Sequence, residues 1–320
     1  MVLLIKEAEV KQILTMPLAM DAVEESFRRQ ASGEAITQPR RRIVLSGKST
    51  LHYMAGVDQT SGYLGMKIYT TSRAGARFLV PLMRADTGEW LALIEGNYLG
   101  QIRTGAATGI ATKWMARKDA STVGILGTGF QAQTQLQAVA LARKLTKVRA
   151  FGRDKERRER FAKEMSTVVN VPVEAADSAE VAVRDADIVI TATSSVHPVL
   201  EGKWLKPGVH VNAIGANYVH KAEIDAEAVA RSQQVVVDSL EQAKMEAGDL
   251  IQAFGTDAER WDNVTELATV VAGKAPGREN NSKITLFKSV GITTEDVAVA
   301  EKIYNIARER GMGVKLPLWD

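Results

Sequence analysis

From residue 121 onward, short apolar runs rich in valine and isoleucine alternate with segments in which apolar residues recur at helical spacing. This alternation is typical of a parallel, doubly wound sheet with helices on both faces. The expected strands are residues 121–126, 147–152, 186–193, 209–215, 234–239 and 283–291. The expected helices between them are residues 130–145, 155–165, 178–186, 225–232 and 263–273. The sequence therefore predicts an α/β domain over residues 116–293.

The first hundred residues follow a different pattern. Two amphipathic helices are expected first, at residues 5–14 and 16–34. Five strands separated by glycine-containing turns are expected next, at residues 41–46, 49–57, 62–71, 77–86 and 89–96. Because strand follows strand, we predict a mostly antiparallel sheet in a separate α+β domain over residues 1–115. An Ala-rich helix at 101–118 leads out of it, and the spacing predicts a last helix over 293–311.

Composition excludes several classes of protein. The chain has 320 residues, which is long enough for two domains of ordinary size, and its composition of 45% hydrophobic and 25% charged residues can form a full core. A formal net charge of +3 implies no strong field for nucleic acid or membrane. The chain has no cysteine, and its four histidines lack metal-ligand spacing, so we expect no metal site. No apolar run reaches bilayer length and the N-terminus lacks a secretory pattern, so a cytoplasmic protein is expected.

A glycine-rich loop lies between the first strand and the first helix of the α/β domain. Gly127, Gly129 and Ala132 stand in G-x-G-x-x-A order. The first glycine permits a tight turn, the second lets a pyrophosphate approach the backbone, and the alanine lets the helix pack on the strand. The sequence therefore predicts a dinucleotide-binding loop. Its predicted cofactor contacts are Gly127, Thr128, Gly129, Phe130, Gln131 and Ala132.

The end of the second strand bears on which dinucleotide is bound. NAD-type sites usually offer a carboxylate here to the ribose 2'-hydroxyl. This chain has Gly152 followed by Arg153, with Arg157 one helical turn later. A small residue followed by a cation suits a 2'-phosphate. NADP(H) is therefore the preferred prediction, and NAD(H) remains the alternative, with Asp154 taking the hydroxyl.

Three cations in the N-terminal region lie among apolar or small residues. Lys67 is the one charge in "GYLGMKIYTT", Arg103 lies in "GQIRTGAATG", and Arg41 begins a strand in "QPRRRIVL". A strand lysine most often faces water. An arginine among small residues, however, suits a carboxylate clamp through its two parallel donors. If the three converged, they would fit an anionic substrate with a reducible C=N or C=O bond.

These stretches together carry a family resemblance. They are "QPRRR", "GYLGMK", "IRTGAATGIATKWMAR", "VGILGTGFQAQTQL", "NAIGAN", "KAEID", "VVVDSLEQA" and "GRENNSKITLFKSVGITTEDVAVA". In this order, along almost the whole chain, they resemble the ornithine cyclodeaminase and mu-crystallin family. The resemblance implies a homodimer with an N-terminal substrate and dimerisation domain, a Rossmann domain, and a C-terminal helix, 294–320, that returns to the first domain. Members include ornithine cyclodeaminases, archaeal-type alanine dehydrogenases and NAD(P)H-dependent reductases of cyclic ketimines.

The resemblance also implies roles for single residues. It places Arg41 and Arg103 on a substrate carboxylate and Lys67 beside the reacting C=N group. Arg40 and Arg42 are alternatives to Arg41, because the run of three arginines leaves open which of them aligns with the family's arginine. The further positions that it places near the cofactor are Thr104, Thr191, Ala192, Thr193, Ser289, Val290 and Gly291.

One departure from the family concerns Asn217. Ornithine cyclodeaminases carry an aspartate at this position, and an amide does not take up a proton as a carboxylate does. Imine reduction needs only orientation, a proton and a hydride. We therefore expect a reductase of a small 2-imino acid, such as 1-pyrroline-2-carboxylate or 1-piperideine-2-carboxylate, giving L-proline or L-pipecolate, with Lys67 and Asn217 as catalytic residues. The alternatives are alanine dehydrogenase, then ornithine cyclodeaminase, or a non-catalytic mu-crystallin-like binder of NADPH.

Overall fold

The computed structural model describes residues 1–319, and the chain divides into two compact units. The first unit comprises Met1–Arg103 and the segment that begins at Gly291, and the second comprises Thr104–Val290. The first division falls inside helix α3 (Asn97–Met115), whereas the expected boundary lay at the end of this helix. Arg103 and Thr104, adjacent in sequence, therefore belong to different units.

The first unit is built on an eight-stranded sheet in the order β16-β1-β7-β6-β5-β4-β2, with β3 also paired to β4. All its pairings are antiparallel except β1 with β7. The strands are β1 (Val2–Ile5), β2 (Ala35–Thr37), β3 (Arg41–Leu45), β4 (Ser49–Asp58), β5 (Tyr63–Ser72), β6 (Gly75–Arg84), β7 (Trp90–Glu95) and β16 (Val314–Leu316). The mostly antiparallel sheet expected from the sequence is confirmed. The short strands β1, β2 and β16 were not predicted.

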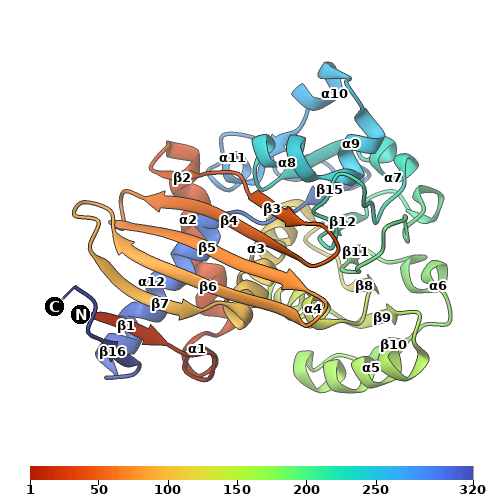
Figure 1. The fold of residues 1–320 in the computed structure, drawn as a ribbon. Helices are drawn as coiled ribbons and strands as arrows, with labels where there is room; N and C mark the ends of the chain where they lie inside the picture. The colour runs from red at the N-terminus through yellow and green to blue at the C-terminus, as the bar shows by residue number, and fades with distance from the viewer. Residues whose placement is uncertain (320) are drawn as a thin grey trace. The chain divides into compact units, whose positions relative to one another are not determined.

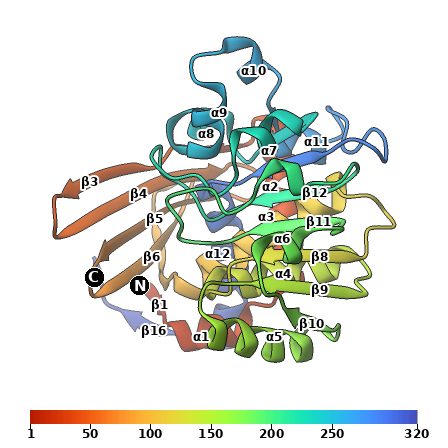
Figure 2. The same ribbon diagram turned by 90° about the vertical axis from the view of Figure 1, so that its right-hand side faces the viewer.

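Helices of the first unit cover one face of this sheet. They are α1 (Glu7–Ile13), α2 (Met16–Ser32) and α12 (Thr293–Glu309). Figure 1 shows α2 and α12 together behind the strands, and Figure 2, turned by 90°, shows both helices on one side of β4, β5 and β6. A glycine allows α12 to lie close, because a Cβ at Gly65 would be 2.8 Å from Val297. The expected helix at 5–14 starts later, at Glu7, because residues 2–5 form a strand that pairs with β7 instead.

The second unit is built on an all-parallel sheet in the order β10-β9-β8-β11-β12-β15-β13-β14. Its strands are β8 (Thr122–Leu126), β9 (Lys147–Phe151), β10 (Val173–Ala175), β11 (Ile188–Thr191), β12 (His210–Ala213), β13 (Gln234–Val237), β14 (Thr265–Glu266) and β15 (Thr285–Lys288). The chain leaves β8 toward β9 and β10, then returns to β11 on the other side of β8. The point between β8 and β11 is therefore the topological switch point, where doubly wound sheets bind their ligands.

Helices cover both faces of the parallel sheet, and alternate residues of a strand enter different cores. Ile188 and Ile190 pack with α4 (Phe130–Ala142) and α5 (Lys155–Val169), while Val189 packs on the other side. The remaining helices are α6 (Ala179–Val183), α7 (Ala226–Arg231), α8 (Leu240–Glu246), α9 (Gly248–Phe254), α10 (Ala258–Asp262) and α11 (Leu267–Val271). The expected doubly wound fold is confirmed.

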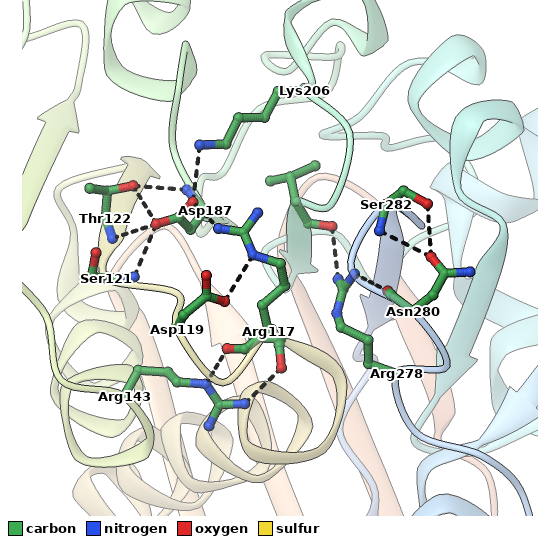
Figure 3. A network of polar contacts seen from close by, with 12 residues as sticks. Arg117, Asp119, Ser121, Thr122, Arg143, Asp187, Lys206, Arg278, Asn280 and Ser282 are labelled. Atoms are coloured by element: carbon green, nitrogen blue, oxygen red, sulfur yellow. Dashed lines mark hydrogen bonds and ion pairs between the residues drawn. The ribbon is translucent and has the colours of Figure 1, made fainter.

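Two arginines of the second unit fix the carboxyl end of α3. Arg143 donates through Nε to the Arg117 carbonyl at 2.7 Å and through Nη2 to the Ala116 carbonyl at 2.8 Å, and Figure 3 shows its guanidinium beside Arg117. Arg278 donates through Nε to the Met115 carbonyl at 2.7 Å. Cations at a helix carboxyl end satisfy its open carbonyls and oppose its dipole. Arg278, part of one of the family-like motifs, is thus a structural residue.

Candidate functional site

The predicted dinucleotide loop leaves β8 at the switch point. Gly127 has φ of 110°, and a Cβ there would collide with the Ala192 carbonyl, so only glycine fits. Gly129 is extended and precedes α4 without a side-chain cap, and the amino end of a helix is a favourable position for an anion. Ala132 is fully buried in the core under α4. The local geometry is that of a pyrophosphate loop.

At the end of β9, Gly152 faces this loop. A Cβ at Gly152 would lie 2.5 Å from the Thr128 hydroxyl, so a larger residue would displace Thr128. Arg153 and Arg157 are both exposed just beyond the strand. Asp154 accepts the Arg157 N–H at 3.0 Å and so caps α5. Its carboxylate is therefore engaged in a structural contact.

A buried carboxylate joins the ends of β11 and β12. Glu223 is fully buried and accepts hydrogen bonds from the Thr191 hydroxyl at 2.9 Å, the Thr193 amide at 2.6 Å and the Gly215 amide at 2.5 Å. Burial, opposed in part by Lys288, raises the pKa of Glu223. Thr191 and Thr193, two predicted cofactor contacts, are thereby fixed at the edge where the glycine loop begins.

A second pair of buried charges supports the loop after β12, which carries Asn217. Lys288, fully buried at the end of β15, contacts Asp249 at 2.8 Å and donates to the Ala216 carbonyl at 2.6 Å. Asp249 in turn accepts the Glu223 amide at 2.6 Å. The loop that carries the half-buried Asn217 is therefore held from both sides.

The predicted contacts after β15 depend on an aspartate that sequence reasoning missed. Asp238, fully buried after β13, accepts the Ser289 hydroxyl and the Val290 amide, each at 2.8 Å. The sequence signal was available, because Asp238 directly follows the apolar run "QVVV".

The first unit contains a buried group of charges. Lys67 on β5 is 4% exposed and Arg103 on α3 is 5% exposed. Asp296 on α12 accepts through Oδ1 from Lys67 Nζ at 2.9 Å and from Arg103 Nε at 3.0 Å. Glu295 accepts from Arg103 Nη1 at 2.7 Å. Burial, with Arg103 next, lowers the pKa of Lys67 to about 8. The structure thus brings Lys67 and Arg103 together and adds two acids that the sequence analysis did not select.

Strand register decides which of the three arginines joins this group. Met54 pairs with Lys67, and Arg42 pairs with His52, so Arg42, His52 and Lys67 share the face of the sheet that α12 covers. Arg41 pairs with Tyr53 on the opposite face and is exposed. The structure therefore does not bring Arg41 to Lys67.

Arg40 also belongs to the buried group. It is 5% exposed, donates to the Gly291 carbonyl at 3.1 Å, and is among the cations that lower the pKa of Lys67. Gly291 itself has φ of 75° and lies against the Arg103 guanidinium, where a Cβ would meet Nη1 at 2.6 Å. Gly291, predicted near the cofactor, thus contacts the two arginines of the first unit, and Thr104 is half-buried in the second.

His52 is a further residue that sequence reasoning missed. Its ring stacks on Tyr69 at 4.2 Å, Tyr69 stacks on Phe78 at 4.9 Å, and Lys67 Nζ lies 5.6 Å from the Phe78 ring. Burial, then Arg42 and Arg40, lowers the pKa of His52 to about 4. The imidazole is therefore neutral near pH 7 and adds no charge to the group.

Residues 1–319 offer no membrane-spanning helix and no metal cluster. None of the helices there is both long and apolar enough to cross a bilayer. Within the same residues, no cluster of three or more histidines, aspartates or glutamates has the arrangement of a metal site.

The switch-point loop and the parallel sheet define a dinucleotide-binding protein of the Rossmann class. The chain belongs to the ornithine cyclodeaminase/mu-crystallin family, whose model matches residues 1–311. A delta(1)-pyrroline-2-carboxylate reductase of Bacillus cereus is 34% identical over 323 residues, covering 98% of this chain and 99% of that protein.

Two solved structures are similar over nearly their full length. One is a Thermococcus litoralis delta(1)-pyrroline-2-carboxylate reductase in complex with NADH and L-proline, with 34% identity, a TM-score of 0.94, and 98% and 100% of the two chains covered. The other is an archaeal alanine dehydrogenase dimer with bound NAD, with 32% identity, a TM-score of 0.93 and 99% of both chains covered. The family, the fold class and the class of oxidoreductase expected from the sequence are confirmed. The preference for NADP(H) stays a prediction.

Proposed function

We propose that this protein is an NAD(P)H-dependent reductase of a small 2-imino acid, with a cyclic ketimine such as 1-pyrroline-2-carboxylate or 1-piperideine-2-carboxylate as substrate. The observation that carries the proposal is the buried pair of Lys67 and Arg103 on the first unit. Arginine supplies a directional carboxylate clamp, and a lysine whose pKa lies at about 8 can donate a proton near neutral pH. The reductases among the relatives support the same substrate class.

The reaction requires a hydride, a proton and a fixed substrate carboxylate. When bound, the dinucleotide supplies the hydride to the carbon of the C=N bond. The electron pair of that bond moves to nitrogen, which takes a proton from the Lys67 ammonium and leaves a neutral lysine. Arg103 holds the carboxylate, and the Asn217 amide hydrogen-bonds the nitrogen or a water. Asn217→Asp tests the role of the Asn217 amide. The assay measures the proline and ammonia that the variant forms from ornithine.

The pH dependence of reduction tests Lys67. Reduction needs the ammonium, so kcat/KM should be level below pH 8 and fall about tenfold per pH unit above it. Lys67→Ala should lower kcat by about 10²–10⁴-fold, which is typical for loss of a general acid, while NADPH binding is kept. Lys315→Ala, an exposed lysine on β16, is the matched control. A Lys67→Ala enzyme that reduces the ketimine at the parental rate would contradict the assignment.

Neighbouring arginines on opposite faces of β3 test the carboxylate clamp. We propose Arg40 and Arg42, rather than Arg41, as the partners of Arg103. Arg42→Ala should raise the KM for the imino acid by roughly 10–100-fold, the loss of one hydrogen bond to a charged group. Arg41→Ala should leave it within about twofold, because a side chain on the far face makes no such bond. The reverse result would refute the register argument.

For the cofactor we propose a preference for NADP(H), supported by Gly152 with Arg153 and Arg157 beyond it. The engagement of Asp154 as a helix cap disfavours the rival contact with a ribose hydroxyl. Arg153→Ala should lower kcat/KM for NADPH about 10-fold or more and change that for NADH little. Arg160→Ala, an exposed arginine further along α5, is the control. Equal use of both dinucleotides by the wild type would refute the proposal.

A substrate panel separates the remaining alternatives. Ketimine reduction is the expected activity, while turnover of pyruvate with ammonia would indicate alanine dehydrogenase. Proline and ammonia from ornithine with catalytic NAD would indicate a cyclodeaminase. NADPH binding without turnover of any of these would indicate a binding protein, which the buried clamp disfavours.

We also propose a homodimer formed through the face of the first sheet that lies opposite α12. Ile36, Ile43 and Tyr53 point to that face by register and are 45%, 62% and 36% exposed. Large apolar side chains that are exposed on one face of a sheet suit an interface. Sedimentation should give about twice 34.8 kDa. Tyr53→Asp should shift the protein to monomer, and a monomeric wild type would exclude the proposal.

A further inference from the structure

The first turn of α12 places a carboxylate between the two cations of the first unit. We propose that Asp296 is a positioning residue that fixes Lys67 and Arg103 relative to each other and keeps Lys67 supplied with its proton. This inference rests on the proposed reductase function. No role was expected for Asp296 from the sequence, although it lies six residues after the predicted contact Val290.

The geometry singles out one oxygen of Asp296. Its Oδ1 accepts from Lys67 Nζ at 2.9 Å and from Arg103 Nε at 3.0 Å, so a single atom sets the spacing of the two cations. Asp296 is fully buried, and among residues 1–319 its Oδ2 has no hydrogen-bond partner. A buried carboxylate with one oxygen uncompensated is costly. A neutral side chain of the same shape would leave Lys67 and Arg103 without the anion that they share, so the carboxylate matches the two cations.

The position of Asp296 on α12 reduces the free-energy cost of its buried charge. Asp296 and Glu295 lie in the first turn of α12, where the helix dipole favours anions. The two acids have different partners: Glu295 contacts Arg103 at 2.7 Å, whereas Asp296 contacts both Arg103 and Lys67. Asp296 is therefore the acid that couples the two cations.

The charges around Lys67 show why its proton depends on this residue. Burial, then Arg103 on α3 and Arg40 before β3, act to lower the pKa of Lys67, and Asp296 on α12 raises it by charge and by hydrogen bonding. With Asp296 present, the pKa is about 8. Without the anion, burial, Arg103 and Arg40 would all act to lower the pKa of Lys67, which would therefore lose its proton at a lower pH.

The test compares Asp296→Asn with Glu295→Gln as the matched control. An opposite charge in contact shifts a pKa by about 1–3 units, so Asp296→Asn should move the alkaline limb of kcat/KM for ketimine reduction down by at least about one unit. Glu295→Gln should raise KM through Arg103 and leave the limb within about 0.3 units. Asp296→Glu, which keeps the charge, should hold the limb near that of the wild type and lower kcat. An unmoved limb in Asp296→Asn, or equal shifts in both amide variants, would overturn the proposal.

A second readout separates this inference from the proposed function. Titration of the Lys67 Cε signal by carbon NMR in lysine-labelled protein reports the same shift without substrate. If the wild type reduces no imine but the Lys67 titration still moves in Asp296→Asn, the function fails and the inference stands. If Asp296→Asn does not fold, Lys67→Met/Asp296→Asn, which removes the buried cation with its anion, should fold. Failure of that double variant would show that Asp296 serves packing alone and would overturn the inference.

Discussion

Asp187, which precedes β11 directly, anchors the amino-terminal ends of two central strands. It is 7% exposed, and its carboxylate contacts Arg117 Nη2 at 2.7 Å and Lys206 Nζ at 3.0 Å (Figure 3). It also accepts the backbone amides of Ser121 and Thr122 at 3.0 and 3.1 Å, just where β8 begins. Asp187→Asn should destabilise the second unit strongly, because an amide NH2 placed among these donors finds no acceptor.

The magnitude follows from what the substitution leaves behind. Removal of one partner of a buried ion pair costs about 3–5 kcal/mol, and here it leaves Lys206 without this anion and Arg117 with only the exposed Asp119. For a unit of this size, about 2–4 °C of melting temperature is lost per kcal/mol, so the transition should fall by roughly 6–20 °C. Burial alone would raise the pKa of Asp187, but hydrogen bonds from Ser121, Lys206 and Thr122 outweigh it and hold the pKa well below its ordinary range. The stabilisation is therefore present above the unfolded pKa of about 3.9 and is lost as the pH falls below it.

Differential scanning calorimetry from pH 7 to pH 3 measures both effects. Asp119→Asn is the matched control, because Asp119 contacts the same Arg117 at 3.1 Å but its side chain is 74% exposed. A surface pair contributes about 0–1 kcal/mol, so this control should lose about 4 °C at most. The gap between wild type and Asp187→Asn should narrow below about pH 4. Equal losses in the two variants, or a gap that widens toward acid, would refute the reasoning.

Two further pairs of variants test the second unit. Gly127→Ala should abolish folding or NADH binding, because a φ of 110° and a carbonyl oxygen in contact exclude a Cβ. Gly129→Ala has open space at its Cβ, so it should keep the melting temperature of the wild type and weaken only NADH binding, measured by fluorescence. Lys288→Met should lower the free energy of unfolding, measured by denaturant titration, by about 3–5 kcal/mol, because it leaves Asp249 without its cation. Lys283→Met, which removes a surface ion pair, should lower the free energy of unfolding by about 0–1 kcal/mol.

Much of the fold could be predicted because the apolar periods differ between the two units. Alternation of strands and helices after residue 121 gives the parallel sheet, and strand following strand before it gives the antiparallel one. The short strands escaped prediction for a physical reason. β1 (Val2–Ile5), β14 (Thr265–Glu266) and β16 (Val314–Leu316) have two to four residues each, too few for a periodic signal, and depend on pairing with strands far away in the sequence.

The site could be predicted less completely, because contacts across strands decide it. The glycine loop is local, and its residues and conformation follow from the sequence. Selection among the three arginines depends on the register between β3 and β4, where a shift of one residue exchanges the two faces. No local pattern fixes that register, so the resemblance implies Arg41, with Arg40 and Arg42 as alternatives, although the side chain of Arg41 points away from Lys67. Asp296 escaped for the same reason, since its partners lie about two hundred residues away.

The two buried lysines show what sequence alone cannot separate. Lys67 and Lys288 are each a lone charge in an apolar stretch near glycine, and both become buried against an aspartate at 2.9 and 2.8 Å. Lys288 has a carbonyl and an aspartate as partners, so its charge is compensated and serves to fix a loop. Lys67 shares its aspartate with Arg103, which also contacts Glu295, and Arg40 is a further cation that acts on Lys67. Burial and two neighbouring arginines lower the pKa of Lys67, and these neighbours suit Lys67 to be the proton donor of the proposed reaction.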